Sequence, residues 1–168
     1  LLIAACKNDP KKQAEPASDE SPMAMSSDTL IYPGEKHFAS IRQITFGGDN
    51  AEAYWSFDDS QIIFQSNYTD WGVECDQMFL MQVGETFEDR KPPMLSTGMG
   101  RTTCGYFLPD NEHILYASTH LAGEACPEVP LRENGNYVWP VYDSFDIFVA
   151  DLQGNITAQL TDERGYDA

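Results

Sequence analysis

The adjacent carboxylates Asp58 and Asp59 are the residues of this sequence that most resemble a catalytic pair, because two acidic groups can divide general acid and base work. They lie in "YWSFDDSQIIFQS", residues 54–66, between an aromatic segment and an apolar run. Asp and Ser at such a place are typical of a tight turn, since their side chains bond the nearby backbone. We therefore interpret the pair as turn-forming and assign no catalytic residue.

Other motifs that carry chemistry are missing from the sequence. It contains no Gly-x-Ser-x-Gly elbow, no His-Glu-x-x-His helix and no phosphate-binding loop. The formal net charge of -17 repels phosphate backbones, so we expect no nucleic-acid partner. The charge leaves a cationic ligand, a metal ion or a protein partner open. With three dispersed histidines, at 37, 113 and 120, we expect no histidine-rich metal site and no cofactor.

The N-terminal residues form a candidate targeting signal. "LLIAAC", residues 1–6, resembles the end of a bacterial lipoprotein signal peptide, in which Cys6 receives the lipid. Residues 7–29 contain no aromatic residue and no Leu, Ile or Val, which predicts a disordered tether. We expect a mature protein anchored through Cys6 to a membrane, on the periplasmic side of the bacterial cell envelope. The alternative is an apolar N-terminal segment with a chance cysteine.

Three further cysteines follow, at 75, 104 and 126. Exported proteins meet an oxidising compartment, so a disulfide is expected, and an odd number permits at most one within the chain. Three reduced, buried thiols are the alternative. No Cys-x-x-Cys spacing is present, which disfavours a structural zinc site.

The strands that position these residues occur as two similar copies in the sequence. Residues 54–66 align without a gap with "YFLPDNEHILYAS", residues 106–118. Each copy predicts two short strands, rich in aromatic and β-branched residues, joined by a tight turn. Asp59 and Asn111 occupy the same turn position and both tolerate a left-handed backbone.

A third and a fourth strand extend the repeat. Residues 75–84 correspond to 145–154, each block ending at a Gly turn, and residues 41–46 correspond to 156–162. The repeated unit is thus four antiparallel strands, which predicts an all-β fold and is typical of a β-propeller blade. An unrelated antiparallel sandwich with two similar hairpins is the alternative.

Residues 36–168 resemble the TolB-like, WD40-like β-propeller repeat family. The resemblance rests on an outer strand ending in Leu-Thr or Ile-Thr, an inner strand, and the turns "SFDD" (56–59) and "LPDN" (108–111), which match the family's Ser-Pro-Asp-Gly turn incompletely. It implies a partial propeller: about two blades and the start of a third, from a ring of six. We therefore expect three segments: a signal end at 1–6, a tether at 7–29, and the N-terminal portion of a propeller at 30–168.

The resemblance also implies where a ligand would bind. Loops 47–50, 67–75, 97–104 and 119–144 would share one face of the propeller, at the mouth of its channel. The candidate binding residues there are Asp49, Asn50, Glu52, Arg101, Thr102 and His120. The alternative is that these side chains bond loop backbones and seal the channel mouth.

Blade geometry further implies a Cys104–Cys126 disulfide that pins the long loop 119–144, here called the insertion, with Cys75 left free. The function expected from the resemblance is a non-catalytic, lipid-anchored scaffold that binds a protein or a small ligand on its loop face. The alternative is the propeller domain of an exported hydrolase, of the prolyl-oligopeptidase type or a metallopeptidase, with its catalytic domain outside this chain.

Overall fold

A computed structural model describes residues 30–131, 133–136 and 138–168 of the chain. The chain divides into two compact units, Leu1–Arg42 and Gln43–Ala168. In the described part of the first unit, the backbone turns at residues 32–35, where Glu35 N donates to Tyr32 O over 3.0 Å. All the named strands belong to the second unit.

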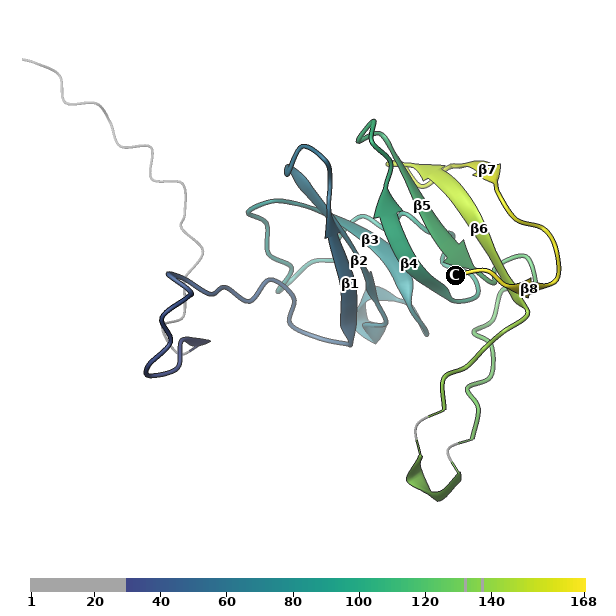
Figure 1. Cartoon of the computed structure of the whole chain (residues 1–168), viewed down its shortest axis with the longest axis horizontal. Helices are drawn as coiled ribbons and strands as arrows, with labels where there is room; N and C mark the ends of the chain where they lie inside the picture. The colour runs from purple at the N-terminus through teal and green to yellow at the C-terminus, as the bar shows by residue number, and fades with distance from the viewer. Residues whose placement is uncertain (1–29, 132, 137) are drawn as a thin grey trace, which may run out of the picture. The chain divides into compact units, whose positions relative to one another are not determined.

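The second unit is all-β and holds two antiparallel sheets (Figure 1). The first has the order β1 (Asn50–Trp55), β2 (Gln61–Ser66), β3 (Gln77–Gln82). The second has the order β4 (Thr102–Phe107), β5 (His113–Ser118), β6 (Ser144–Asp151), β7 (Ile156–Gln159), and a short β8 (Gly165–Tyr166) pairs in parallel with the start of β6. Two short 3-10 turns, η2 (Thr69–Trp71) and η3 (Glu133–Gly135), lie in the connections after β2 and β5. Within the described residues, no helix is long and apolar enough to cross a membrane.

The two copies of the hairpin fold in the same way, as the repeat predicts. β1 pairs with β2 and β4 pairs with β5. β1 and β4 are the inner strands of the two copies, and each has a register shift at the same place, before Tyr54 and before Tyr106. The predicted left-handed turn residues are confirmed, with φ of 59° at Asp59 and 57° at Asn111.

Asp58 has the turn role predicted for it. Its Oδ1 accepts from Ser56 Oγ at 2.6 Å and from the backbone N of Ser60 at 3.1 Å. The Ser56 hydroxyl, followed by Ser60, lowers the pKa of Asp58 from its usual value. A carboxylate committed to its own turn in this way stabilises the hairpin.

The register of the third strand corrects the sequence alignment. Gln77 pairs with Ser66, whereas Asp146 pairs with Ser118, so Gln77 is the equivalent of Asp146 and not of Ile147. The error comes from aligning the two glycines. The turn after β3 has Gly84 in its third position, while the turn after β6 has Gly154 in its fourth. A shift of one residue exchanges the two faces of a strand, so the correction decides which side chains enter the core.

The first sheet has three named strands, and residues 93–95, to which the repeat assigns no strand, lie in the fourth place. Residues 93–95 lie along β3, because Leu80 N donates to Pro93 O at 2.9 Å and Leu95 N donates to Met78 O at 2.8 Å. Residues 41–46 do not pair with β3. Instead Thr45 forms a parallel bridge with Phe87, and Phe87 N donates to Ile44 O at 2.9 Å. The second sheet has its fourth strand where predicted, as β7.

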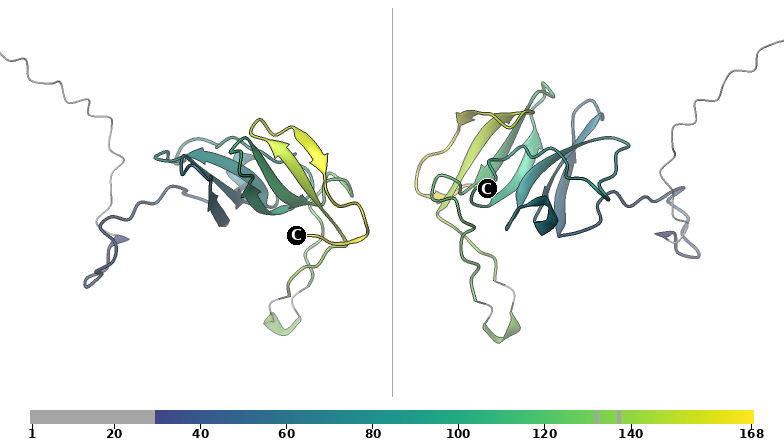
Figure 2. Two further views of the ribbon diagram at one scale, coloured as in Figure 1. Left: turned by 45° about the horizontal axis from the view of Figure 1, so that its top comes forward. Right: turned by 180° about the vertical axis from the view of Figure 1, so that it is seen from behind.

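The core consists of two clusters on opposite faces of the first sheet. One lies between the sheets and contains Ile63, Met78, Leu80, Leu95, Phe107, Ile114, Tyr116, Phe148 and Ala150. The other lies on the far face of the first sheet, where Phe64, Trp71, Val73, Phe79, Met81 and Phe87 gather. Figure 2 shows the two sheets from behind, side by side, with the long connection between β5 and β6 extending beyond them.

Candidate functional site

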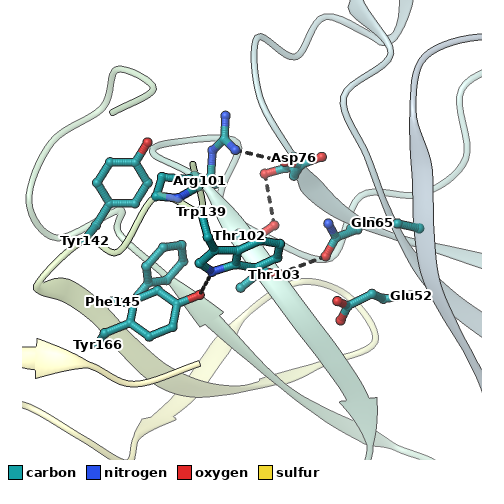
Figure 3. A pocket seen from close by; sticks show the side chains of 12 residues that line it. Glu52, Gln65, Asp76, Arg101, Thr102, Thr103, Trp139, Tyr142, Phe145 and Tyr166 are labelled. Carbon is teal, nitrogen blue, oxygen red and sulfur yellow. Dashed lines mark hydrogen bonds and ion pairs between the residues drawn. The ribbon is translucent and has the colours of Figure 1, made fainter. Parts of the chain in front are cut away.

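A cavity of about 380 Å³ opens where β1 and β4 begin (Figure 3). The returning connection before β6 and the C-terminal β8 close its other side. Its lining residues are Ala51, Glu52, Gln65, Asp76, Arg101, Thr102, Thr103, Trp139, Pro140, Tyr142, Phe145 and Tyr166. The polar residues come from the two hairpins and their loops, and the aromatic residues come from the connection, β6 and β8, so the cavity has two chemically different walls.

The polar wall begins at the two register shifts in β1 and β4, where each strand forms a bulge. Glu52 and Cys104 occupy the same repeat position, and both adopt a left-handed backbone, with φ of 49° and 54°. A bulge re-aims the side chain that it carries. Thr103 Oγ1 donates to Gln65 Oε1 at 3.1 Å, which ties the start of β4 to the end of β2 across the two sheets.

Arg101 and Asp76 form the charged part of this wall. Arg101 Nη1 lies 3.4 Å from Asp76 Oδ2, and both side chains are largely buried. Thr102 N and Oγ1 donate to the backbone O of Asp76 at 2.9 and 3.1 Å, which holds the pair at the start of β4. Burial raises the pKa of Asp76, Arg101 acts against that rise, and the carboxylates of Asp49 and Glu52 add to it.

The aromatic wall is held by its own contacts. Trp139 Nε1 donates to Tyr166 Oη at 3.2 Å, and the Tyr166 ring packs edge-to-face on Phe145, with centroids 5.4 Å apart. Tyr142 lies on the other side of Phe145 at 6.0 Å and its hydroxyl donates to Glu128 O at 2.9 Å. Four rings from three segments of the chain therefore form one surface.

Three of the six predicted binding residues line the cavity: Glu52, Arg101 and Thr102. Asp49 and Asn50 lie beside it and are engaged with loops. Asp49 N donates to Asn67 Oδ1 at 2.8 Å, and Asn50 Nδ2 donates to Gly47 O at 3.0 Å. The Asn50 side chain thus bonds a loop backbone, as the alternative expects, whereas the Asp49 carboxylate accepts from the Asn67 side chain at 3.2 Å.

His120 is not part of the cavity. It is buried, its Nδ1 lies 3.0 Å from Ser118 Oγ, and its ring packs on Phe148 with centroids 4.4 Å apart. Burial lowers its pKa, and Asp146 partly opposes that effect. Its role is packing at the end of β5.

The predicted Cys104–Cys126 disulfide is wrong. Cys126 is bonded to Cys75, with a Cα–Cα distance of 6.0 Å, and Cys104 is a free thiol. The bulge at Cys104 turns its side chain toward Glu52. Burial raises the pKa of the Cys104 thiol, a hydrogen bond with Thr103 acts against that rise, and the Glu52 carboxylate adds to it. Gly100 N donates to Glu124 O at 2.9 Å, which brings the start of the insertion onto the loop beside Cys75.

Sequence reasoning missed Gln65, Asp76 and the whole aromatic wall. The segment "VWPVY", residues 138–142, was a signal, because aromatic residues are uncommon in a solvent-facing loop. Within the described ranges, no three His, Cys, Asp or Glu side chains gather closely enough to hold a metal ion. The predicted lipidation residue Cys6 lies outside the described residues.

Comparisons with family models, with curated proteins and with solved structures find no match to this chain. The class of protein therefore rests on the structure itself, which defines an all-β protein built from a repeated hairpin, with a cavity at the start of both inner strands.

Proposed function

We propose that this chain forms consecutive blades of a TolB-like β-propeller and acts as a lipid-anchored scaffold of the bacterial cell envelope. It binds a small ligand or a protein on its loop face and catalyses no reaction. The observation that carries the proposal is the cavity at the start of β1 and β4, where side chains from both sheets and from the insertion converge.

Stacking of equivalent sheets supports the propeller. The face that the first sheet packs against the second carries Ile63, Met78, Leu80 and Leu95. By the pairing of the strands, the same positions on the far face of the second sheet hold Leu115, Ile147, Val149 and Leu160. Leu95 is fully buried while Leu160 is 57% exposed. A further sheet stacked in the same way would cover these side chains.

The Cys75–Cys126 disulfide supports export, because disulfides persist in oxidising compartments such as the periplasm. Cys6, in its lipobox-like context, supplies the anchor. Loops gathered on one end of a rigid β scaffold are where binding sites usually lie, and the cavity falls within the size range of small-ligand sites, about 300 to 1,000 Å³.

The test is thermal unfolding of the full 168-residue chain against a panel of neutral, anionic and cationic small compounds. The expected result is a rise in Tm with some members of the panel that disappears in Ala51→Trp, which fills the cavity. Ala53→Trp is the matched control, since Ala53 lines a second hollow beside Ile44 and Phe64 but not this cavity. If no compound raises Tm, or if Ala51→Trp leaves the rise intact, the small-ligand site is wrong.

A further inference from the structure

The charge of the cavity is negative. Three carboxylates act on this site, those of Glu52, Asp76 and Asp49, against the single guanidinium of Arg101. Arg101 is already paired with Asp76 at 3.4 Å, so the charge left over is that of Glu52 and its neighbour Asp49. Asp49 is tied to Asn67 in the adjacent loop, which leaves Glu52 as the carboxylate that lines the cavity.

Glu52 is aimed into the cavity by its backbone. A left-handed conformation is uncommon for a residue other than Gly, Asn or Asp, and such outliers gather at ligand sites. Figure 3 shows the Glu52 carboxylate directed toward the side of the cavity where Trp139 lies. Cys104, the equivalent residue of the next inner strand, places a neutral thiol beside it, because the pKa of Cys104 is raised by burial and then by Glu52 itself.

The opposite wall offers ring faces and edges rather than charges. Trp139, Tyr142, Phe145 and Tyr166 are fixed by one another, so little side-chain ordering remains when a ligand enters. The negative face of an aromatic ring attracts a cation within about 6 Å of the ring centre, and Trp is the strongest of these partners. A carboxylate facing an aromatic wall is the arrangement that recognises an ammonium or guanidinium group.

We propose that this cavity binds an organic cation, an ammonium or guanidinium group on a short aliphatic stem, with Glu52 accepting its hydrogen bonds and the Trp139–Tyr166 wall covering its stem. The inference rests on the proposed function and names its ligand class. An anion meets the like charge of Glu52, and a neutral alcohol leaves that carboxylate without its counter-charge, so both bind more weakly. The net charge of -17 also raises the local concentration of cations around the chain.

The experiment is isothermal titration calorimetry of the full chain at pH 7 with four probes: butylamine, choline, butan-1-ol and butyrate. Butylamine and butan-1-ol share a butyl stem, and butyrate is an anion with the same total number of carbons, so the comparison isolates the contribution of the cation. The expected result is that butylamine and choline bind about tenfold or more tighter than butanol, and that butyrate binds more weakly still.

Two variants and a charge-matched control complete the design. Glu52→Gln should weaken butylamine binding about tenfold, because the ion pair is lost while the shape is kept. Trp139→Leu should weaken choline more than butylamine, since a quaternary ammonium depends on the ring faces. Asp89→Asn removes one negative charge from the exposed loop after β3, outside the cavity, and should leave both affinities unchanged. Far-UV circular dichroism and Tm of each variant establish that the fold is retained.

One further titration distinguishes a free amine from a basic side chain of a protein partner. The peptide Gly-Gly-Lys-Gly-Gly presents the same ammonium on a chain; tighter binding than butylamine indicates a basic side chain of a protein partner, and weaker binding indicates a free amine. The inference is overturned if butanol binds as tightly as butylamine, if Glu52→Gln changes nothing, or if no cation binds. Neutral compounds that bind and are blocked by Ala51→Trp would overturn the cation inference while leaving the proposed function standing.

Discussion

Tyr54 and Tyr106 hold the same position in two copies of one repeat, 52 residues apart, and their rings touch, with centroids 5.4 Å apart in an edge-to-face arrangement. The neighbouring turns are joined as well, since Phe57 N donates to Asn111 Oδ1 at 2.7 Å. Equivalent residues that contact each other require two sheets stacked with their inner strands side by side. The contact between the Tyr54 and Tyr106 rings therefore reports directly on how the two sheets are arranged.

The tyrosine contact should be measurable as a coupling energy. In a double-mutant cycle with Tyr54→Ala and Tyr106→Ala, we expect a coupling of about 1 kcal/mol in the free energy of unfolding, the value typical of an edge-to-face aromatic pair. Urea denaturation of the four proteins measures it. The control cycle pairs Tyr106→Ala with Ile156→Ala on β7, three strands away in the same sheet, and should be additive. Additivity in both cycles would show that the inner strands do not meet at Tyr54 and Tyr106.

The repeat supplies a matched pair of leucines for the stacking of the sheets. Leu95 N donates to Met78 O in the first sheet, and Leu160 N donates to Ile147 O in the second, so the two leucines are equivalent. In this 168-residue chain, Leu95→Ala should lower the free energy of unfolding by about 3 kcal/mol, because it leaves a cavity between the sheets. Leu160→Ala, on the open face, should cost less than about 0.5 kcal/mol. Equal costs in urea denaturation would contradict the stacking.

The hairpins were predictable from sequence because their turn chemistry is local. Asp59 and Asn111 occupy left-handed positions that their residue types favour, and the gapless alignment fixes which strand residues are equivalent. The third strand was misaligned by one residue, because its register depends on pairing with β2 and β5 rather than on its own turn. Because contacts between two strands set the register, the sequence of one strand alone does not determine it.

The candidate site was predictable in part for the same reason. Glu52, Arg101 and Thr102 follow from the start of the inner strands, which the repeat locates. Trp139 and Tyr142 reach the cavity only because the insertion folds back, and Tyr166 because β8 pairs with β6. The disulfide was mispaired because the side-chain direction of Cys104 is set by a bulge that leaves no signal in a strand pattern.

The cysteines give a covalent test of the fold. Non-reducing peptide mapping of the protein should recover a Cys75–Cys126 peptide and a Cys104 that alkylates once the chain is unfolded. The bond closes a loop with a sequence separation of 51, so Cys126→Ser should lower the free energy of unfolding by about 4 kcal/mol on the chain-entropy account. Cys104→Ser is the control and should change it by less than about 1 kcal/mol. Recovery of Cys104 in a disulfide-linked peptide would refute this pairing.

Cys6 remains a prediction that rests on its sequence context. If it carries the lipid, the wild-type protein should sediment with membranes and its N-terminal peptide should gain the mass of the acyl groups. Cys6→Ser should move the protein to the soluble envelope fraction, while Cys104→Ser should leave it in the membrane fraction. A Cys6→Ser protein that still sediments with membranes, with no lipid mass on the wild-type peptide, would remove the anchor from the proposal.

Tyr116 offers a stabilising substitution whose effect depends on pH. Its ring is fully buried between the sheets, and its hydroxyl has no hydrogen-bond partner among the described residues. Removing an unsatisfied buried hydroxyl in Tyr116→Phe should raise the free energy of unfolding by about 1 kcal/mol at pH 7. Tyr32→Phe, at a tyrosine that is 82% exposed, is the matched control and should have no effect.

The advantage of Tyr116→Phe should grow in alkali. Burial raises the pKa of Tyr116 from 10.0 to about 12. Between these values the unfolded chain loses the proton and the folded chain keeps it, so the wild-type protein loses stability as pH rises from 10 to 12. The Phe variant lacks this loss, and the difference between the two proteins in urea denaturation should therefore widen from pH 9 to pH 11. A difference that stays constant over this range would mean that the Tyr116 hydroxyl is solvated in the folded protein, and a Phe variant less stable than wild type at pH 7 would mean that the hydroxyl has a partner.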